Sequence, residues 1–298
     1  MRYDIFANWR INLLCNFRCE YCFYSVFIED KKKQNLNGEY SIEKVIEGFN
    51  KSGLIWLIYI TGGEPFLQPG FLELCRGLTE KHYIGINTNL STKNIYDFAK
   101  YINPEKVRFI HSSLHIDERK RLDLIDDFLQ KYHLLKKAGF NIYVTQVLYP
   151  PVLEKFDEIF EFFKKNGVII RPKIFRGYYK ERHYPADYTQ KEREKILNYF
   201  EISRKLDNLK PLEMDPALDK KFIYGNLSFK GLLCSAGKDF VLIEHNGRVM
   251  RCYGIAVDLG NIFEGEIHLF KKAEPCTADI CPCPYYGLRC ARGTPEVI

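Results

Sequence analysis

The chain has 298 residues, of which 46% are hydrophobic, 15% aromatic and 28% charged, and its formal net charge is +6. This composition can bury a large core and excludes disordered, collagen-like and low-complexity proteins, and so small a charge excess gives no reason to expect a nucleic-acid partner. The longest apolar run, 54–60, is too short to span a membrane, and Asp4 and Arg10 interrupt the N-terminal stretch where a secretory signal would lie.

From residue 1 to about residue 175, short apolar segments alternate with amphipathic ones. The apolar segments are rich in Ile, Val, Tyr and Phe, as strands buried on both faces tend to be. The six strands that this pattern predicts are Ile5–Leu14, Ile55–Thr61, Tyr83–Asn87, Val107–Leu114, Asn141–Leu148 and Val168–Phe175. The helices expected between them are Ser41–Lys51, Phe71–Lys81, Thr92–Tyr101, Leu122–Ala138 and Leu153–Lys165. This α/β alternation predicts parallel βα units, but the pattern alone does not distinguish a partial barrel from a doubly wound sheet.

The rest of the chain divides into a connector and a tail. Tyr178–Tyr188 is polar and aromatic without periodicity, and we expect Thr189–Leu206 to form a charged helix that packs on the barrel. In the tail, Asn246-Gly247 lies between two apolar segments, which is a strong signal for a two-residue β-hairpin. The tail is small and loop-rich, so it would need a metal centre to stabilise it. The expected units are a barrel domain, 1–176, a connector, 177–230, and the tail domain, 231–298.

Nine of the ten cysteines fall in two clusters, Cys15–Cys22 and Cys234–Cys290. Short and uneven gaps favour metal ligation in a reducing compartment over long-range disulfides, so we expect a cytoplasmic protein. The tenth cysteine, Cys75, lies among leucines at helical spacing and is expected in the core.

The first cluster, Cys15, Cys19 and Cys22, has the spacing CxxxCxxC and follows the first predicted strand. Three thiolates in this arrangement can ligate three irons of a [4Fe–4S] cube and leave the fourth iron open to a ligand from outside the protein. The alternative is a zinc site, but structural zinc takes four tetrahedral ligands, and no further His or Cys lies nearby in the sequence. The spacing therefore favours an iron–sulfur cluster.

Polar segments follow the next three predicted strands as well. They are Gly62-Gly63-Glu64-Pro65, Asn87-Thr88-Asn89 and Ser112-Ser113-Leu114-His115. In parallel α/β folds, ligands bind at the carboxyl ends of the strands, so these segments are expected at one rim together with the cysteines. Each segment is weak evidence alone, since the first could be a plain turn and the second a helix cap. Their shared location indicates a ligand site.

With Tyr21 just before the last cysteine and Gly62-Gly63-Glu64-Pro65 at the second strand end, residues 1 to about 175 resemble the radical S-adenosylmethionine (SAM) superfamily. The resemblance implies a (β/α)6 partial TIM barrel in which SAM binds the open iron of the cluster. Reductive cleavage of SAM would give a 5′-deoxyadenosyl radical that abstracts hydrogen from substrate. The segment from Gly62 to Pro65 would bind SAM, with Glu64 and the glycine backbone holding its amino group. Tyr21 would lie near the adenine, and Asn89 and Ser113 would face the ribose or the carboxylate.

The second cluster resembles the C-terminal SPASM/twitch extension of radical SAM enzymes, which carries auxiliary iron–sulfur clusters. Cys234 and Cys252 bracket the expected hairpin, so its two arms can bring both sulfurs to one cluster. The tail departs from the full SPASM pattern, because it has six cysteines whereas two fully cysteine-ligated cubes need eight. We therefore expect one auxiliary [4Fe–4S] cluster, with the remaining ligands drawn from Cys281 first, then Cys276 or Cys283, and Cys290 in reserve.

We expect an oxidoreductase that dehydrogenates a small molecule such as a sugar or aminocyclitol, with the auxiliary cluster accepting an electron. Because only fourteen residues precede Cys15, we do not expect the N-terminal leader-binding domain that peptide-modifying relatives often carry, and this favours a small molecule. The alternative is a peptide maturase that forms cross-links or epimers and relies on a separate leader-binding protein. A non-catalytic iron–sulfur module is a remote alternative. The expected reductant is an acidic flavodoxin or ferredoxin.

A few other residues near the expected rim are candidates for ligand contact. His115 follows the fourth strand and could touch SAM or substrate. Arg171 and Arg176 could pair with an anionic group of the substrate or simply line the rim. The aromatic segment from Tyr178 to Tyr184 could contact substrate or only pack over the mouth of the barrel.

Overall fold

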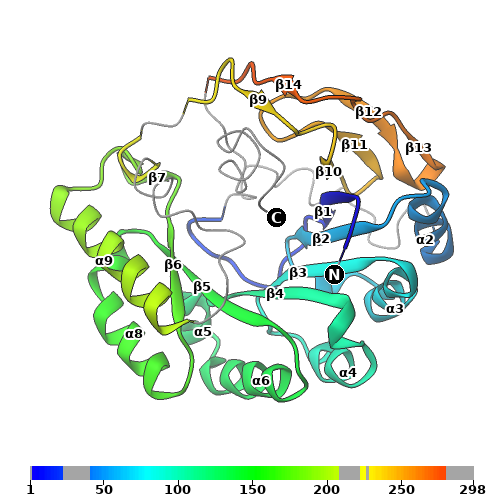
Figure 1. Cartoon of the computed structure of the whole chain (residues 1–298). Helices are drawn as coiled ribbons and strands as arrows, with labels where there is room; N and C mark the ends of the chain where they lie inside the picture. Colours follow the sequence, from blue (N-terminus) through cyan, green and yellow to red (C-terminus); the bar gives the residue numbers. More distant parts are fainter. Residues whose placement is uncertain (1, 23–40, 208–221, 226–227, 280–298) are drawn as a thin grey trace.

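The computed structural model describes residues 2–22, 41–207, 222–225 and 228–279 (Figure 1). Six parallel strands form an incomplete barrel, and they neighbour one another in chain order. A doubly wound sheet would reverse its strand order at a switch point, so the fold is the partial barrel of the two expected alternatives. The strands are β1 (Ile5–Asn12), β2 (Trp56–Gly62), β3 (Tyr83–Thr88), β4 (Val107–Ser113), β5 (Ile142–Leu148) and β6 (Ile170–Ile174).

Helices cover the outside of this barrel (Figure 1). They are α2 (Ile42–Lys51), α3 (Phe71–Lys81), α4 (Asn94–Tyr101), α5 (Ile116–Arg121), α6 (Ile125–Lys137), α7 (Pro150–Glu154) and α8 (Phe156–Lys165), with short 3-10 turns at Pro65–Leu67 and Pro104–Lys106. Local sequence signals explain where several of them begin and end. Ser41 caps α2, its hydroxyl oxygen accepting from the amide of Lys44, and Gly139 and Gly167 follow α6 and α8 with positive φ.

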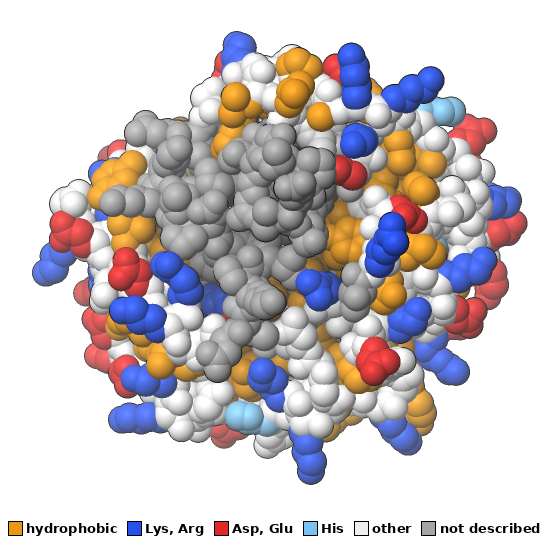
Figure 2. All heavy atoms as spheres, in the orientation of Figure 1, with side chains coloured by type: hydrophobic (Ala, Val, Ile, Leu, Met, Phe, Trp, Pro, Cys, Tyr) orange, Lys and Arg blue, Asp and Glu red, His pale blue; other side chains and the backbone are white. Residues whose placement is uncertain are grey.

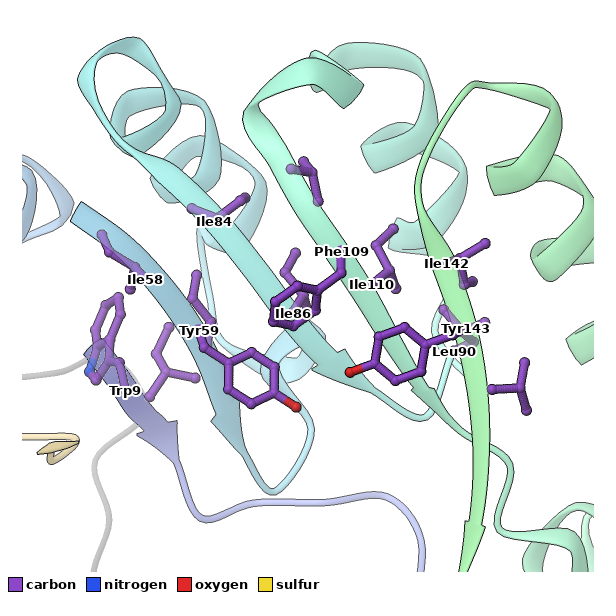
Figure 3. Close-up of a cluster of buried hydrophobic side chains, with 14 of the residues drawn as sticks. Trp9, Ile58, Tyr59, Ile84, Ile86, Leu90, Phe109, Ile110, Ile142 and Tyr143 are labelled. Carbon is purple, nitrogen blue, oxygen red and sulfur yellow. The ribbon is translucent and has the colours of Figure 1, made fainter. Parts of the chain in front are cut away.

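Alternation along the strands divides the buried side chains into two sets. Ile58, Ile84, Ile110 and Ile142 point toward the helices, whereas Tyr59, Phe109 and Tyr143 point into the barrel (Figure 3). The inner set also contains a buried polar group. The two ring nitrogens of His111 lie 2.7 Å from the hydroxyl of Tyr59 and 2.7 Å from the hydroxyl of Thr145, so this histidine links three strands inside the barrel.

The tail continues the same sheet. Strand β10 (Phe240–Ile243) pairs in parallel with β1, and β11 (Arg248–Met250), β12 (Asp258–Asn261) and β13 (Glu266–Ile267) follow it as an antiparallel extension. The hairpin expected around Asn246-Gly247 is present as the β10–β11 connection, but its loop has three residues, 245–247, instead of two, because the Glu244 amide donates to the Arg248 carbonyl (2.9 Å). A 3-10 turn follows β12 at Ile262–Glu264, and a separate two-stranded sheet pairs β9 (Leu233–Cys234) with β14 (Glu274–Pro275).

The structure differs from the sequence-based expectations in three places. The helix expected from Leu122 begins at Ile125, because Asp123 has φ 54°, and the unexpected helix α5 precedes it. The helix expected at Leu153–Lys165 is divided into α7 and α8. The segment expected to lack regular structure contains a small hairpin of β7 (Gly177–Tyr179) and β8 (Arg182–Tyr184). The connector helix α9 (Gln190–Leu206) does pack on the barrel, since the hydroxyl of Ser203 donates to the Ile170 carbonyl.

Side chains of both charge signs lie around the edge of the side seen in Figure 2, with hydrophobic side chains between them. Within the described residues, no helix is both long enough and apolar enough to cross a membrane.

His82, at the amino end of β3, gives the fold a dependence on pH. The ring is buried, its Nδ1 accepts from the Trp56 amide (3.4 Å), and burial followed by Lys81 and Lys106 lowers its pKa to about 4. Between pH 6.5 and 4 the unfolded chain therefore binds a proton that the folded chain does not, so stability falls as the pH falls.

A His82→Asn variant keeps an acceptor near the Trp56 amide but removes the titrating ring. From pH 7 to pH 5, its free energy of unfolding should fall by about 2 kcal/mol less than that of the wild type. Urea denaturation at a series of pH values measures both curves. Parallel curves would show that His82 is not the neutral buried group that its surroundings predict.

Candidate active site

The segment that leads to the first cysteine is attached to the carboxyl end of β2. The amide of Gly63 donates to the Asn12 carbonyl (3.0 Å), and the amide of Glu64 donates to the Leu14 carbonyl (2.6 Å). A Cβ atom at Gly63 would lie 1.9 Å from the Leu14 carbonyl oxygen, so a larger residue would force the backbone apart. The glycine therefore permits the close approach that fixes the position of Cys15.

The cysteine loop, residues 15–22, begins at the carboxyl end of β1. The amide of Phe17 donates to Cys15 Sγ (3.4 Å), and the amide of Cys22 donates to the Cys19 carbonyl (3.1 Å). Phe17 is buried and anchors the loop, whereas all three cysteines are free and partly exposed. The thiols are thus held at the rim of the barrel and remain accessible.

The thiols of the loop affect one another electrostatically. Burial raises the pKa of Cys15 to about 11, and the charges of Glu64 and Cys22 add to the effect. Burial likewise raises the pKa of Cys19, with both other thiols contributing. Thiols with a raised pKa, as Cys15 and Cys19 have, ionise together only beside a concentrated positive charge such as bound metal supplies.

A cluster fits this donor set better than a single ion does. Each cysteine of a [4Fe–4S] cube binds a different iron, so the three sulfurs need not converge on one point. Among the residues that the structure describes, no three His, Cys, Asp or Glu side chains lie close enough together to hold one metal ion.

Glu64 is completely buried, and its carboxylate binds the protein. It accepts from the Thr88 hydroxyl (2.7 Å) and from the amides of Asn89 (2.6 Å) and Phe66 (3.1 Å). Burial outweighs these hydrogen bonds and raises its pKa to about 7. Pro65 starts the short 3-10 turn behind it. The side chain expected to hold a ligand ammonium therefore joins the end of β2 to the end of β3.

The two other expected SAM contacts lie in different surroundings. Asn89 is buried beside the cysteine loop, where its Nδ2 donates to Asn16 Oδ1 (3.0 Å) and lies 3.8 Å from Cys15 Sγ. Ser113 lies farther along the rim on β4, and its hydroxyl donates to Asn87 Oδ1 (3.1 Å). Asn89 thus joins the cysteine loop directly, and Ser113 does not.

An aromatic group borders the loop on its other side. The Tyr21 hydroxyl lies 2.9 Å from His115 Nδ1, and the Tyr21 ring packs on Tyr149 with 4.8 Å between ring centroids. Burial, followed by the charges of Arg119 and Lys173, lowers the pKa of His115 to about 3. The ring is therefore neutral, and its Nδ1 can accept a hydrogen bond from the Tyr21 hydroxyl. His115 contacts the loop through this bond.

The sequence gives no signal for one further residue, Arg119 of α5. Its side chain is completely buried and donates to the carbonyls of Leu114 (2.6 Å) and Asn89, while its guanidinium lies over the rings of Phe128 (4.1 Å) and Phe17 (5.5 Å). One side chain thus connects two strand ends with the cysteine loop.

An Arg119→Met variant keeps the length of the side chain but removes its donors. Two buried carbonyls lose their partners, so we expect a stability loss of about 2–4 kcal/mol. Because Asn89 and Phe17 are released together, iron binding by the cysteine loop should fall as well. Thermal unfolding and iron content measure the two effects, and a variant with normal values in both would contradict this role.

In the tail, three expected cluster ligands lie on neighbouring segments. Cys234 of β9 is paired with Glu274, and Cys276 follows β14, with its amide donating to the Leu232 carbonyl (2.8 Å). This register places both cysteines on the same face of the ribbon as diagonal neighbours, about 7–8 Å apart. Both are buried, and Cys252 is partly exposed. Cys281, Cys283 and Cys290 lie outside the described residues.

The tail also supplies polar side chains to the barrel. Glu244, just after β10, forms an ion pair with Arg10 of β1, with Nε 2.8 Å from the carboxylate. The hydroxyl of Tyr253 donates to Asn8 Oδ1 (3.2 Å). The sequence analysis did not predict either contact, because both depend on the pairing of β10 with β1.

The cations expected at the rim have partners within the chain. Arg171 Nε donates to Asp207 Oδ2 (2.6 Å), and the Arg176 guanidinium lies 3.9 Å from the ring centroid of Phe222. In the aromatic segment beyond them, Tyr178 is exposed. Arg171 is therefore engaged by a carboxylate of the connector in this structure.

Comparison with known proteins gives a consistent result. The family model of the radical SAM superfamily matches residues 10–163, which is more than half of the chain. GTP 3′,8-cyclase of Actinobacillus pleuropneumoniae serotype 3 (strain JL03) is 30% identical over 102 residues, which cover 34% of this chain and 29% of that enzyme. The chain therefore matches less than a third of the length of this curated relative.

Two solved structures share the fold over most of the chain. AnSMEcpe with bound AdoMet and Cp18Cys peptide has a TM-score of 0.59 at 18% identity, covering 87% of this chain and 77% of that one. Streptococcus suis SuiB bound to the precursor peptide SuiA has a TM-score of 0.58 at 16% identity, covering 88% and 63%. The likeness extends past the family-model region into the C-terminal strands, so the expected partial barrel with a small C-terminal sheet is confirmed.

Proposed function

Because the chain belongs to the radical SAM superfamily, we propose that Cys15, Cys19 and Cys22 hold a [4Fe–4S] cluster at which SAM is cleaved reductively to start hydrogen abstraction from a substrate. The observation that carries the proposal is the attachment of the cysteine loop to the end of β2 through Gly63 and Glu64. This attachment places three thiols and a close-approaching backbone at one rim, where a ligand of an open iron would also reach the protein.

The residues of the rim would divide the binding of SAM among them. Backbone groups of Gly62 and Gly63 would hold the amino group of SAM. The Glu64 carboxylate would keep this segment in place through its hydrogen bonds to the end of β3. Asn89 would orient the ligand beside Cys15, and Tyr21, held by His115, would lie against the adenine. Ser113 is assigned to the ribose or carboxylate side. When bound, the cluster supplies the electron that cleaves SAM to methionine and the 5′-deoxyadenosyl radical.

We assign one auxiliary [4Fe–4S] cluster to the tail, with Cys234, Cys252 and Cys276 as three of its ligands. Two buried cysteines on paired strands and a third on the adjoining hairpin support this assignment. The fourth ligand would come from Cys281, Cys283 or Cys290. Such a cluster would accept an electron during substrate oxidation, and an acidic flavodoxin or ferredoxin would reduce the enzyme.

For the substrate we favour a peptide over a small molecule, which reverses the order of preference drawn from the sequence. Two structures with this fold are described with peptides bound, and the likeness to each includes the C-terminal strands. The tail residues Glu244 and Tyr253 contact Arg10 and Asn8 of β1, so the tail would help to form the wall that a substrate meets.

Deuterium transfer into 5′-deoxyadenosine tests the activity and the substrate class together. The reduced enzyme is incubated with SAM and with extracts of fully deuterated cells, separated into a peptide fraction and a fraction of small metabolites. We expect 5′-deoxyadenosine in all reduced samples and deuterium in it only with peptides. Deuterium only with metabolites would restore the small-molecule assignment, and absence of 5′-deoxyadenosine with a competent reductant would support the non-catalytic module.

A further inference from the structure

Arg251 is a buried cation in the tail that the roles assigned so far do not use. It follows β11 and directly precedes Cys252 in the sequence. Only 5% of the residue is exposed, although it carries a positively charged guanidinium. A charged group in such surroundings requires hydrogen bonds and a compensating charge.

Its hydrogen bonds join the segments that carry the three described tail cysteines, Cys234, Cys252 and Cys276. Nε donates to the Ala236 carbonyl (3.2 Å), two residues after Cys234. Nη2 donates to the carbonyls of Glu274 (3.0 Å) and Pro275 (3.2 Å), directly before Cys276. Since Arg251 is itself bonded to Cys252 along the chain, one side chain fixes the spacing of all three cysteines.

The remaining contacts hold the guanidinium in place without neutralising it. It lies 5.4 Å from the ring centroid of Phe270, whose amide donates to the Gly237 carbonyl (2.8 Å). Every hydrogen-bond acceptor of Arg251 in the described part of the chain is a neutral backbone carbonyl. None of these described partners carries a negative charge, so a bound anion beside Arg251 would be stabilised.

An auxiliary cluster would be that anion. A [4Fe–4S]2+ core with four thiolate ligands has a net charge of −2, and one-electron reduction makes it −3. A fixed positive charge beside it stabilises the reduced form more than the oxidised form and so raises the reduction potential. Arg251 combines this charge with hydrogen bonds to each ligand-bearing segment.

We propose that Arg251 is the positioning residue of the auxiliary cluster, holding Cys234, Cys252 and Cys276 at cluster spacing and raising the potential of the bound cluster. The inference rests on the auxiliary cluster of the proposed function. It identifies which side chain assembles the site and adapts it to accept an electron.

The test uses the full chain with Cys15, Cys19 and Cys22 replaced by alanine, so that iron and spectra report the tail alone. In this background, Arg251→Gln removes the charge and Arg251→Lys retains it without the forked geometry. Arg248→Gln is the matched control, because Arg248 lies in β11, three residues before Arg251, but is exposed and paired with Asp258. Iron and sulfide content and the midpoint potential from EPR-monitored titration are measured after anaerobic reconstitution.

We expect the triple-alanine variant with Arg251 intact, which is the background, to bind about four irons per chain. Arg251→Gln should lose at least half of this iron, and the residual cluster should show a tenfold lower reduced-to-oxidised ratio at fixed potential, which is a downward shift of 59 mV. Arg251→Lys should lose iron but keep the potential, and Arg248→Gln should match the background in both.

Two results would overturn the inference, and they are distinct from failure of the proposed function. Unchanged iron and potential in Arg251→Gln would contradict both roles of Arg251. An equal potential shift in Arg251→Lys and Arg251→Gln would contradict the charge effect, even if Arg251→Gln folds poorly. A background protein without iron would instead refute the auxiliary cluster itself, and this inference with it.

Discussion

Replacing Cys19 by alanine should reduce 5′-deoxyadenosine formation to the level of a reaction without enzyme. The cube at the cysteine loop would have two protein ligands instead of three, and the pKa of Cys19 shows that its thiol shares the electrostatic surroundings of the other two. Iron content should fall from about eight to about four per chain, because only the tail cluster would remain. Anaerobic reconstitution, followed by iron analysis and chromatography of the nucleoside product, measures both.

The matched control is Cys75→Ala. Cys75 is a free, completely buried thiol on α3, outside both clusters. Its replacement removes one small side chain from the core and should cost stability without changing iron content or SAM cleavage. Equal activity in the Cys19 and Cys75 variants would contradict the assignment of the cysteine loop.

The second large effect is expected from Gly63→Ala. The added Cβ would lie 1.9 Å from the Leu14 carbonyl oxygen, and neither backbone segment can move without displacing Cys15 or Glu64. A displacement of about 1 Å at a reacting centre is enough to lower its rate roughly 100-fold. We therefore expect SAM cleavage to fall about 100-fold and SAM binding to weaken, as measured by product formation and equilibrium dialysis with labelled SAM.

Gly53→Ala separates this steric effect from a general loss of glycine. Gly53 has φ +68°, but no atom lies within 4 Å of its added Cβ, and it precedes β2 at the opposite end of the strand. The substitution should cost about 1 kcal/mol through backbone strain and leave SAM cleavage unchanged. If both variants lose activity alike, the close approach at Gly63 is not the cause.

The elements that sequence reasoning predicted well are those with strong local signals. The six barrel strands are found within a few residues of their predicted bounds, because uninterrupted apolar runs between helical patterns have few other interpretations. Cys15, Cys19 and Cys22 do follow the end of β1 as expected, whereas their role as cluster ligands stays a prediction. Helix α5 was missed because it has six residues and its N-cap residue, His115, has φ 49° and makes no side-chain capping hydrogen bond.

Features that depend on distant residues were beyond local patterns. The pairing of β1 with β10 joins residues more than 230 positions apart, and with it come the contacts of Glu244 and Tyr253. Arg119 lies in the charged run Ile116–Arg121, where its sequence neighbours look like solvent-facing residues. Two of the three partners of the Glu64 carboxylate, the Thr88 hydroxyl and the Asn89 amide, lie at the end of the next strand, 24 and 25 residues further along the chain.

The central claim is that one iron of the cluster on Cys15, Cys19 and Cys22 remains open to SAM. The most direct test is ENDOR spectroscopy of the reduced enzyme with SAM that carries 15N in its methionyl amino group. The account predicts a 15N hyperfine coupling that is present in the wild type and in Cys75→Ala and lost in Cys19→Ala. A fully reconstituted protein that shows no 15N coupling would mean that every iron is closed by protein ligands, and it would contradict the account.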